Sequence, residues 1–176
     1  MNFIQNIDIS ILNFIQEYLR NGFLDNFMPL ITRLGDLGII WVAISLILIL
    51  SRKYRKIGLM CLGSLILSTI IGEGILKHTI QRSRPFVAVD NIKLLVKAPT
   101  SFSFPSGHSF SSFAVATVIA NKIKKYKIPV YILASLIVFS RLYLYVHYPS
   151  DVLVGVLLGI VCAKVVCKFY KDNSRY

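Results

Sequence analysis

Five long apolar runs constrain this chain more than any other feature of its sequence. They lie at about 36–51, 57–77, 107–122, 128–147 and 150–167, and each is expected to cross a membrane. Several are shorter than the roughly 20 residues that a hydrocarbon core about 30 Å thick requires, so interfacial residues must extend them or the bilayer must thin locally. With 55% hydrophobic residues in a chain of 176, these runs predict an all-α polytopic membrane helix bundle.

The first 34 residues differ from the rest of the chain. Apolar residues recur there at helical spacing, at Ile4, Ile7, Ile11, Ile15 and Leu19, with polar residues between them. This pattern predicts an amphipathic helix over 3–19 that lies on the membrane rather than crossing it, and residues 23–33 continue in the same style. A single domain over 1–176 would combine this segment at 1–34 with the bundle at 36–167. No basic region precedes the first apolar residues, so no cleavable signal peptide is expected.

The formal net charge of +12 comes from cations at the ends of the apolar runs. Four lie within 52–56 and four within 122–127, and more end the chain at Lys164, Lys168, Lys171 and Arg175. By the positive-inside rule these regions face the cytoplasm. The N-terminal segment, the connection at 78–106 and the turn near Tyr148 then face outward. No nucleic-acid partner is expected, because the basic residues form no single soluble face.

Three polar clusters lie beside the outward-facing connections. The first contains Lys77 and Arg84, which is followed by Pro85. Arginine presents planar donors that match phosphate oxygens, and lysine acts as a point charge. The alternative is that these cations only extend their head groups to the membrane surface.

The second cluster, Pro-Ser-Gly-His at 105–108, opens the third apolar run. Free N–H groups at a helix start bind anions, and Gly107 allows close approach to the backbone. His108 would then lie beside the anion, where it can donate a proton. The alternative is a simple helix cap by Ser106 with an incidental histidine.

The third cluster runs from Ser140 to Asp151. Arg141 adds a donor, His147 offers a ring nitrogen, and Asp151, four residues on, can hold the proton of the other nitrogen. The alternative is a core histidine with satisfied hydrogen bonds and an aspartate that suits a helix N-terminus. Because ionisable groups at the edge of membrane-length runs are costly to desolvate, we expect all three clusters to be walls of one site.

Together the clusters resemble the signature of the type 2 phosphatidic acid phosphatase family, which shares its site with vanadium haloperoxidases. Its three parts, Lys-x6-Arg-Pro, Pro-Ser-Gly-His and Ser-Arg-x5-His-x3-Asp, are matched at every position, and the resemblance covers about residues 36–167. The chain departs from the family at its N-terminus. Many bacterial members look six-spanning, whereas here the first span is missing or reduced to the amphipathic helix.

The resemblance implies a role for each matched residue. His147 would attack phosphorus and form a phosphohistidine, Asp151 would orient it, and His108 would protonate the leaving oxygen. The phosphoryl oxygens would be bound by side-chain cations and backbone groups, at Lys77, Arg84, Ser106, Gly107 and Arg141. Because these cations would take the charge-neutralising role of a Mg²⁺, no metal and no cofactor is expected.

The expected activity is therefore hydrolysis of a lipid phosphate or diphosphate at the extracytoplasmic face of the cell membrane. Undecaprenyl diphosphate is favoured by analogy, with phosphatidylglycerophosphate or phosphatidate next. A transporter would need polar groups along a path through the bilayer, and the inner halves of these runs offer almost none. A non-catalytic lipid-binding protein could lose His108, His147 or Asp151, yet all are present. A haloperoxidase is disfavoured because those enzymes are large and soluble.

Some further residues have simpler interpretations. An ion pair between Glu73 and Lys77 is favoured over a tuning role for Glu73, and His78 is expected to be an interfacial residue. Gly155 and Gly159 form a step suited to close helix contact, where packing within the bundle is favoured over a homodimer face. The three cysteines lie in apolar runs without metal-ligand or redox spacing and are expected to be packing residues, at Cys61, Cys162 and Cys167.

Overall fold

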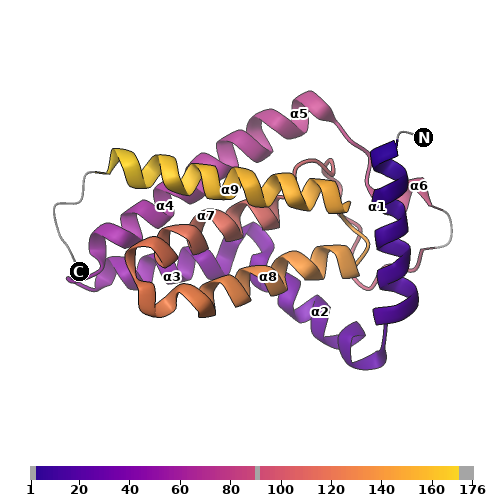
Figure 1. The fold of residues 1–176 in the computed structure, drawn as a ribbon, viewed down its shortest axis with the longest axis horizontal. Coiled ribbons are helices and arrows are strands. Elements are labelled where there is room, and N and C mark those ends of the chain that lie inside the picture. The colour runs from indigo at the N-terminus through magenta and orange to yellow at the C-terminus, as the bar shows by residue number, and fades with distance from the viewer. Residues whose placement is uncertain (1–2, 90–91, 171–176) are drawn as a thin grey trace.

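The structure, a computed structural model, describes residues 3–89 and 92–170. Within these ranges the regular structure is helical, with no strand. Long helices run side by side along the length of the molecule, and α1 lies across one end of them (Figure 1). Four helical segments of the described chain are long and apolar enough to cross a membrane: Gly22–Leu50, Arg55–Ala88, Lys124–Tyr143 and Pro149–Phe169.

The first of these segments is longer than the sequence analysis predicted. It consists of α2 (Gly22–Gly35) and α3 (Ile39–Leu50), joined by a short 3₁₀ turn at Asp36–Gly38 in which Leu37 and Gly38 have positive φ angles. The expected start near residue 36 is therefore the position of a kink, and residues 23–33 belong to the long segment. Polar residues on α2 interrupt its hydropathy, while its other face buries Met28 and Thr32.

The second segment contains a change of helical pitch beside the polar clusters. Helix α4 (Arg55–Thr69) passes into a π-helical turn at Ile70–Leu76 and then into the short α5 (Lys77–Ile80). Turns of this kind occur frequently at functional sites, because the extra residue per turn re-aims the side chains that follow. The chain then continues through the short α6 (Pro85–Ala88) and a loop to residue 106.

Helix α7 (Gly107–Lys122) occupies the middle of the bundle and packs against α4, α8 and α9. With 16 residues it is about 24 Å long, which is short for a membrane span. A Cβ atom at Gly155 would lie 2.8 Å from the Ser106 carbonyl oxygen, and one at Gly159 would lie 2.6 Å from that of Phe110. The glycine step therefore packs α9 against α7, so a homodimer would have to use another face.

The fourth apolar run ends earlier than predicted. Helix α8 (Lys127–Tyr143) stops four residues before the expected limit, and α9 (Pro149–Phe169) begins at a proline. The turn between them includes Tyr145 in the left-handed region, at φ 59°. Its residues look like a continued span because Leu144 and Val146 are apolar, yet the turn carries His147 into the interior.

Helix α1 (Phe3–Phe14) and the π-helical turn Ile15–Leu19 cross the end of the bundle. The predicted isoleucine stripe faces outward at Ile4, Ile7 and Ile11, while Asp8 and Leu12 are buried against the protein. An exposed apolar stripe suits a helix that lies on a membrane, and the predicted surface position of this helix stays a prediction. The burial of an aspartate was not expected.

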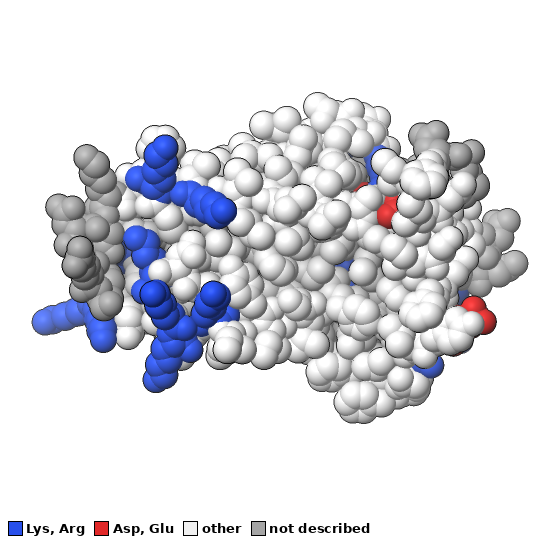
Figure 2. Space-filling view, in the orientation of Figure 1, with Lys and Arg blue, Asp and Glu red and all other residues white. Residues whose placement is uncertain are grey.

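Lysine and arginine gather at the end of the bundle away from α1, in the orientation of Figure 2. This end is formed by the connection after α3, the connection between α7 and α8, and the end of α9. The predicted cytoplasmic residues Lys171 and Arg175 lie outside the described part of the chain. All three cysteines are free, and Cys61 and Cys162 are buried, as expected for packing residues.

Candidate active site

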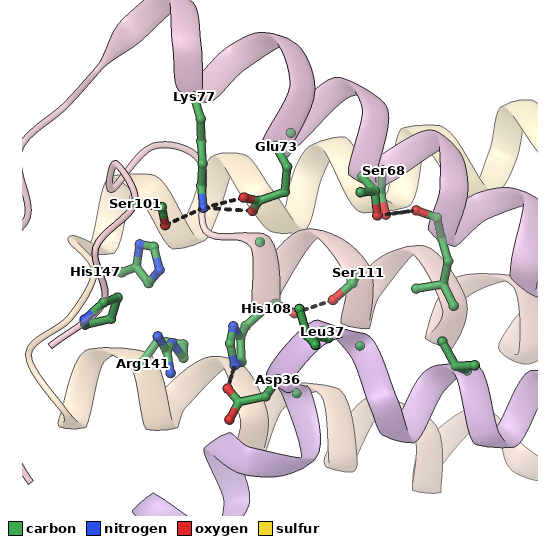
Figure 3. A pocket seen from close by; sticks show the side chains of 18 of the residues that line it. Asp36, Leu37, Ser68, Glu73, Lys77, Ser101, His108, Ser111, Arg141 and His147 are labelled. Atoms are coloured by element: carbon green, nitrogen blue, oxygen red, sulfur yellow. Dashed lines mark hydrogen bonds and ion pairs between the residues drawn. The ribbon is translucent and has the colours of Figure 1, made fainter. Parts of the chain in front are cut away.

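A cavity of about 890 Å³ brings the three polar clusters together near the end of the bundle that α1 crosses. Six of the eight predicted site residues line it: Lys77, Arg84, Gly107, His108, Arg141 and His147. The other two, Ser106 and Asp151, are fully buried beside it. Figure 3 shows Lys77, His147, Arg141 and His108 around one common space. The expected single site is thus present in the structure.

The cavity is walled by three buried cations, Lys77, Arg84 and Arg141. Lys77 Nζ lies 2.7 Å from Glu73 Oε1, which confirms the predicted ion pair, and donates to Ser101 Oγ at 3.2 Å. Arg84 donates to the carbonyl oxygens of Ser101 and Val146, both at 2.7 Å. These contacts hold the cations around the cavity, although burial of like charges is costly.

Arg141 is the cation of the cavity wall whose hydrogen-bond donors are incompletely satisfied. Its Nη1 donates to Thr32 Oγ1, whereas its buried Nε has no hydrogen-bond partner among the described residues. A buried, unpaired donor on a charged group costs free energy. An oxyanion in the cavity would supply both the missing acceptor and the missing negative charge.

His147 lies in the turn between α8 and α9 and is only 2% exposed. Its Nε2 lies 3.2 Å from Arg84 Nη1. Because a guanidinium can only donate, Nε2 must accept and therefore carries a lone pair. Burial lowers the pKa of His147 well below its usual value, and the charges of Arg84 and Arg141 lower it further. The imidazole is thus neutral at neutral pH, as a nucleophile requires.

Asp151 does not contact His147 in the predicted way. Its Oδ2 is 3.8 Å from His147 Nδ1, which is too long for a hydrogen bond. Ser103 Oγ donates to Asp151 Oδ2 at 2.5 Å and lies 3.5 Å from Nδ1, so this hydroxyl contacts both groups. Helix α9 begins at Pro149, which places Asp151 in its first turn near the histidine but does not give the direct hydrogen bond.

His108 occupies the first turn of α7, where Ser106 caps the helix by accepting from Ser109 N. Its Nε2 lies 3.0 Å from Asp36 Oδ1 and 3.2 Å from the Thr32 carbonyl oxygen. A carbonyl only accepts, so Nε2 carries a hydrogen and Nδ1 is the nitrogen left for other chemistry. Gly35 makes this contact possible, because a Cβ there would lie 2.5 Å from the His108 ring.

Sequence reasoning missed several residues of the site. Asp36 pairs with His108, and an acidic residue at the edge of an apolar run could have indicated this. Ser101 and Ser103 had no distinguishing pattern. Arg82 matches no position of the three motifs, yet its Nη1 donates to Asp151 Oδ1 at 2.6 Å. His78 is exposed and does not line the cavity.

The described residues contain no group of three or more His, Cys, Asp or Glu side chains that could hold a metal ion. The charged groups that line the cavity are mainly cations, which suit an anionic ligand. The site can therefore bind an oxyanion beside two histidines, one with a lone pair on Nε2 and one held by a carboxylate.

A family model described as the PAP2 superfamily matches residues 58–175, a range that contains all three motifs. An undecaprenyl-diphosphatase of Sulfolobus acidocaldarius is 32% identical over 157 residues, which cover 88% of this chain and 75% of that protein. The crystal structure of Aquifex aeolicus LpxE has a TM-score of 0.80 at 29% identity, and the alignment covers 92% of this chain and 95% of that one.

A second solved structure is similar over the whole chain. The PAP2-type phosphatidylglycerolphosphate phosphatase of Bacillus subtilis has a TM-score of 0.79 at 29% identity, covering 100% of this chain and 90% of that one. The family match extends over more than half of the chain, and the matched motifs meet in one cavity. This protein therefore belongs to the PAP2 superfamily.

Proposed function

We propose that this protein hydrolyses a lipid phosphate or diphosphate through a phosphohistidine intermediate. The observation that carries the proposal is the cavity wall of three buried cations, one with an unpaired donor, beside a histidine whose Nε2 carries a lone pair. Phosphoryl transfer relies mainly on positioning and on stabilising charge at the phosphoryl oxygens. This wall provides both without a metal ion.

In the proposed first step, phosphoryl oxygens accept hydrogen bonds from Arg84 and Arg141. Arg84 then no longer donates to His147, whose Nε2 lone pair attacks phosphorus. A nitrogen–phosphorus bond forms as the bond to the leaving oxygen breaks, and His108 gives that oxygen a proton. Because Nε2 of His108 donates to Asp36, the proton comes from Nδ1 of an imidazolium ring that Asp36 stabilises.

In the second step, water attacks the phosphorus of the phosphohistidine. His108, now neutral, takes a proton from this water through Nδ1. The nitrogen–phosphorus bond breaks with its electron pair returning to His147 Nε2, and inorganic phosphate leaves. One histidine therefore serves as acid and then as base, which returns the site to its starting state.

The apolar part of the cavity supports a lipid substrate. Beside the cations, the cavity is lined by apolar side chains of α3 and α4: Val42, Leu62, Leu65 and Ile66. A lipid could place its headgroup at the cations while its chain stays against these residues. Undecaprenyl diphosphate is the favoured substrate, because the relative from Sulfolobus acidocaldarius bears the name undecaprenyl-diphosphatase. Phosphatidylglycerophosphate or phosphatidate is the alternative, and the Bacillus subtilis structure supports the former.

Purified protein should release phosphate from lipid phosphates in the presence of EDTA, since side-chain cations rather than Mg²⁺ neutralise the phosphoryl charge. The measurement is phosphate release from undecaprenyl diphosphate, phosphatidylglycerophosphate and phosphatidate. Release from none of these lipids would contradict the proposed function. Loss of activity in EDTA that Mg²⁺ restores would contradict only the metal-independent mechanism.

The site is expected to face the extracytoplasmic side. Lysine and arginine gather at the end of the bundle away from α1 (Figure 2), whereas the cavity is lined by the start of α7 and by His147 in the turn before α9. A cysteine at the exposed Lys97, which lines the cavity mouth, should react with a membrane-impermeant maleimide in intact cells. A cysteine at the exposed Tyr126 should react only after the membrane is permeabilised. The parent chain, with its own three cysteines, provides the background, and the reverse pattern would invert the topology.

A further inference from the structure

Asp8 of α1 is a buried carboxylate with no part in the proposed reaction. It is only 2% exposed, although it lies in a helix whose isoleucine side chains face outward. Its Oδ1 accepts the backbone N–H of Ser150 at 2.8 Å, and its Oδ2 accepts from Ser150 Oγ at 2.5 Å and from Arg82 Nη2 at 2.7 Å. A buried charge needs such partners. Docking of α1 therefore depends on contacts at the start of α9.

Arg82 joins Asp8 to the active site. While Nη2 donates to Asp8, Nη1 donates to Asp151 Oδ1 at 2.6 Å and to Ser150 Oγ at 2.7 Å. The guanidinium carbon lies 3.9 Å from the centre of the Tyr148 ring. A planar guanidinium can serve two carboxylates in fixed directions, which an ammonium cannot. Arg82 is thus held by two carboxylates and one aromatic face.

The orientation of Asp151 depends on this arginine. Oδ1 is held by Arg82, and Oδ2 accepts from Ser103 Oγ and from the backbone N–H of Tyr148 at 3.0 Å. The Ser103 hydroxyl stands next to His147 Nδ1. If the Oδ1 contact loosens, the carboxylate can rotate, and the hydroxyl beside the histidine loses its fixed acceptor.

We propose that Asp8 and Arg82 are positioning residues of the active site: Asp8 holds Arg82, and Arg82 holds Asp151 in the orientation that His147 requires. The N-terminal helix α1 then contributes to catalysis indirectly, by positioning residues of the active site through Asp8. The inference rests on the proposed roles of His147 and Asp151. Neither Asp8 nor Arg82 lines the cavity, so their contribution should affect the chemical step rather than substrate binding.

The first test is Asp8→Asn, which keeps the shape but turns a donor toward Arg82. We expect kcat for p-nitrophenyl phosphate to fall about tenfold, a typical effect of a group that orients a directly acting residue, with KM unchanged. Arg82→Lys should lower kcat at least as much, because an ammonium cannot bridge two carboxylates. Glu17→Gln is the matched control, since it removes an exposed carboxylate from the same segment and should leave kcat unchanged.

A double-mutant cycle separates positioning from a merely structural role. If Asp8 acts through Asp151, then Asp8→Asn should lower kcat less than about twofold in an Asp151→Asn background, because the group that it orients is already altered. If Asp8 has only a structural role, Asp8→Asn lowers the folded fraction. The apparent kcat then falls by the same factor whether Asp151 is intact or replaced by asparagine. Thermal unfolding of each purified variant measures that folded fraction.

The outcomes distinguish this inference from the proposed function. An unchanged kcat in Asp8→Asn, or equal factors in the two backgrounds, would overturn the positioning role while leaving the reaction intact. Full turnover in both His147→Ala and Asp151→Asn would overturn the proposed phosphohistidine mechanism, and the inference with it. A tenfold loss of kcat that Asp8→Asn causes only when Asp151 is intact supports both the inference and the proposed mechanism.

Discussion

His147→Ala should lower turnover of every phosphate ester substrate by at least about 10⁴-fold, because the variant has no nucleophile. No other group around the cavity is expected to replace it: Lys77, Arg84 and Arg141 are cations in ion pairs or hydrogen bonds, and His108 in its proposed imidazolium form has no lone pair. Steady-state assays with a lipid phosphate and with p-nitrophenyl phosphate measure the loss.

The matched control for this variant is His78→Ala, because His78 is an exposed histidine outside the cavity. It should retain the parent activity. Rapid quenching of the parent with ³²P-labelled substrate should trap an acid-labile, base-stable phosphoenzyme that His147→Ala lacks. Residual turnover in a folded His147→Ala protein, or a phosphoenzyme that survives in it, would assign the nucleophile to another residue.

His108→Ala should have an effect that depends on the leaving group. An alkoxide leaves poorly without a proton, and general acid catalysis contributes about 10²–10⁴-fold, so hydrolysis of a lipid monoester should fall by that factor. A nitrophenolate needs little protonation, so the phosphorylation step with p-nitrophenyl phosphate should fall much less. The burst phase of nitrophenolate release isolates this step from the hydrolysis that follows.

Asp36→Asn is the companion variant, since it keeps the His108 ring in place but removes the charge that stabilises its imidazolium form. Its loss should be smaller than that of His108→Ala and should show the same preference between substrates. Equal losses for lipid monoester and p-nitrophenyl phosphate in His108→Ala would mean that His108 binds the phosphoryl group and does not protonate the leaving oxygen.

The separation of effects between the two histidines has a structural reason. Arg84 donates to Nε2 of His147 and so leaves a lone pair on that nitrogen, while Asp36 and a carbonyl oxygen hold a hydrogen on Nε2 of His108. Nε2 is therefore unprotonated in His147 and protonated in His108. Both depend on hydrogen-bond partners that lie far away in the sequence.

The sequence determined the helical membrane class and predicted a set of site residues. Apolar periodicity and run length are local properties, so the helices α7 and α9 and the start of α4 were predicted to within a few residues. The motifs also predicted the site residues, because each motif lies within one short stretch of chain, in a turn or at the start of a helix. Six of the eight predicted site residues line one cavity, and the other two are buried beside it. Ionisable groups buried in a small bundle are costly unless they pair or bind a ligand, so they gather at one place.

Only the tertiary structure decided which partners complete the site. Asp36 meets His108 across 72 residues, and Asp8 meets Ser150 across 142. Such contacts arise from the kink in the first long segment and from the crossing of α1 over the bundle end, which no local pattern encodes. The sequence spacing of His147 and Asp151 suggested a direct hydrogen bond, but the two groups lie 3.8 Å apart and the hydroxyl of Ser103 contacts both. Hydrogen-bond partners depend on which residues the fold brings close together, whereas the pattern of apolar residues can be read directly along the chain.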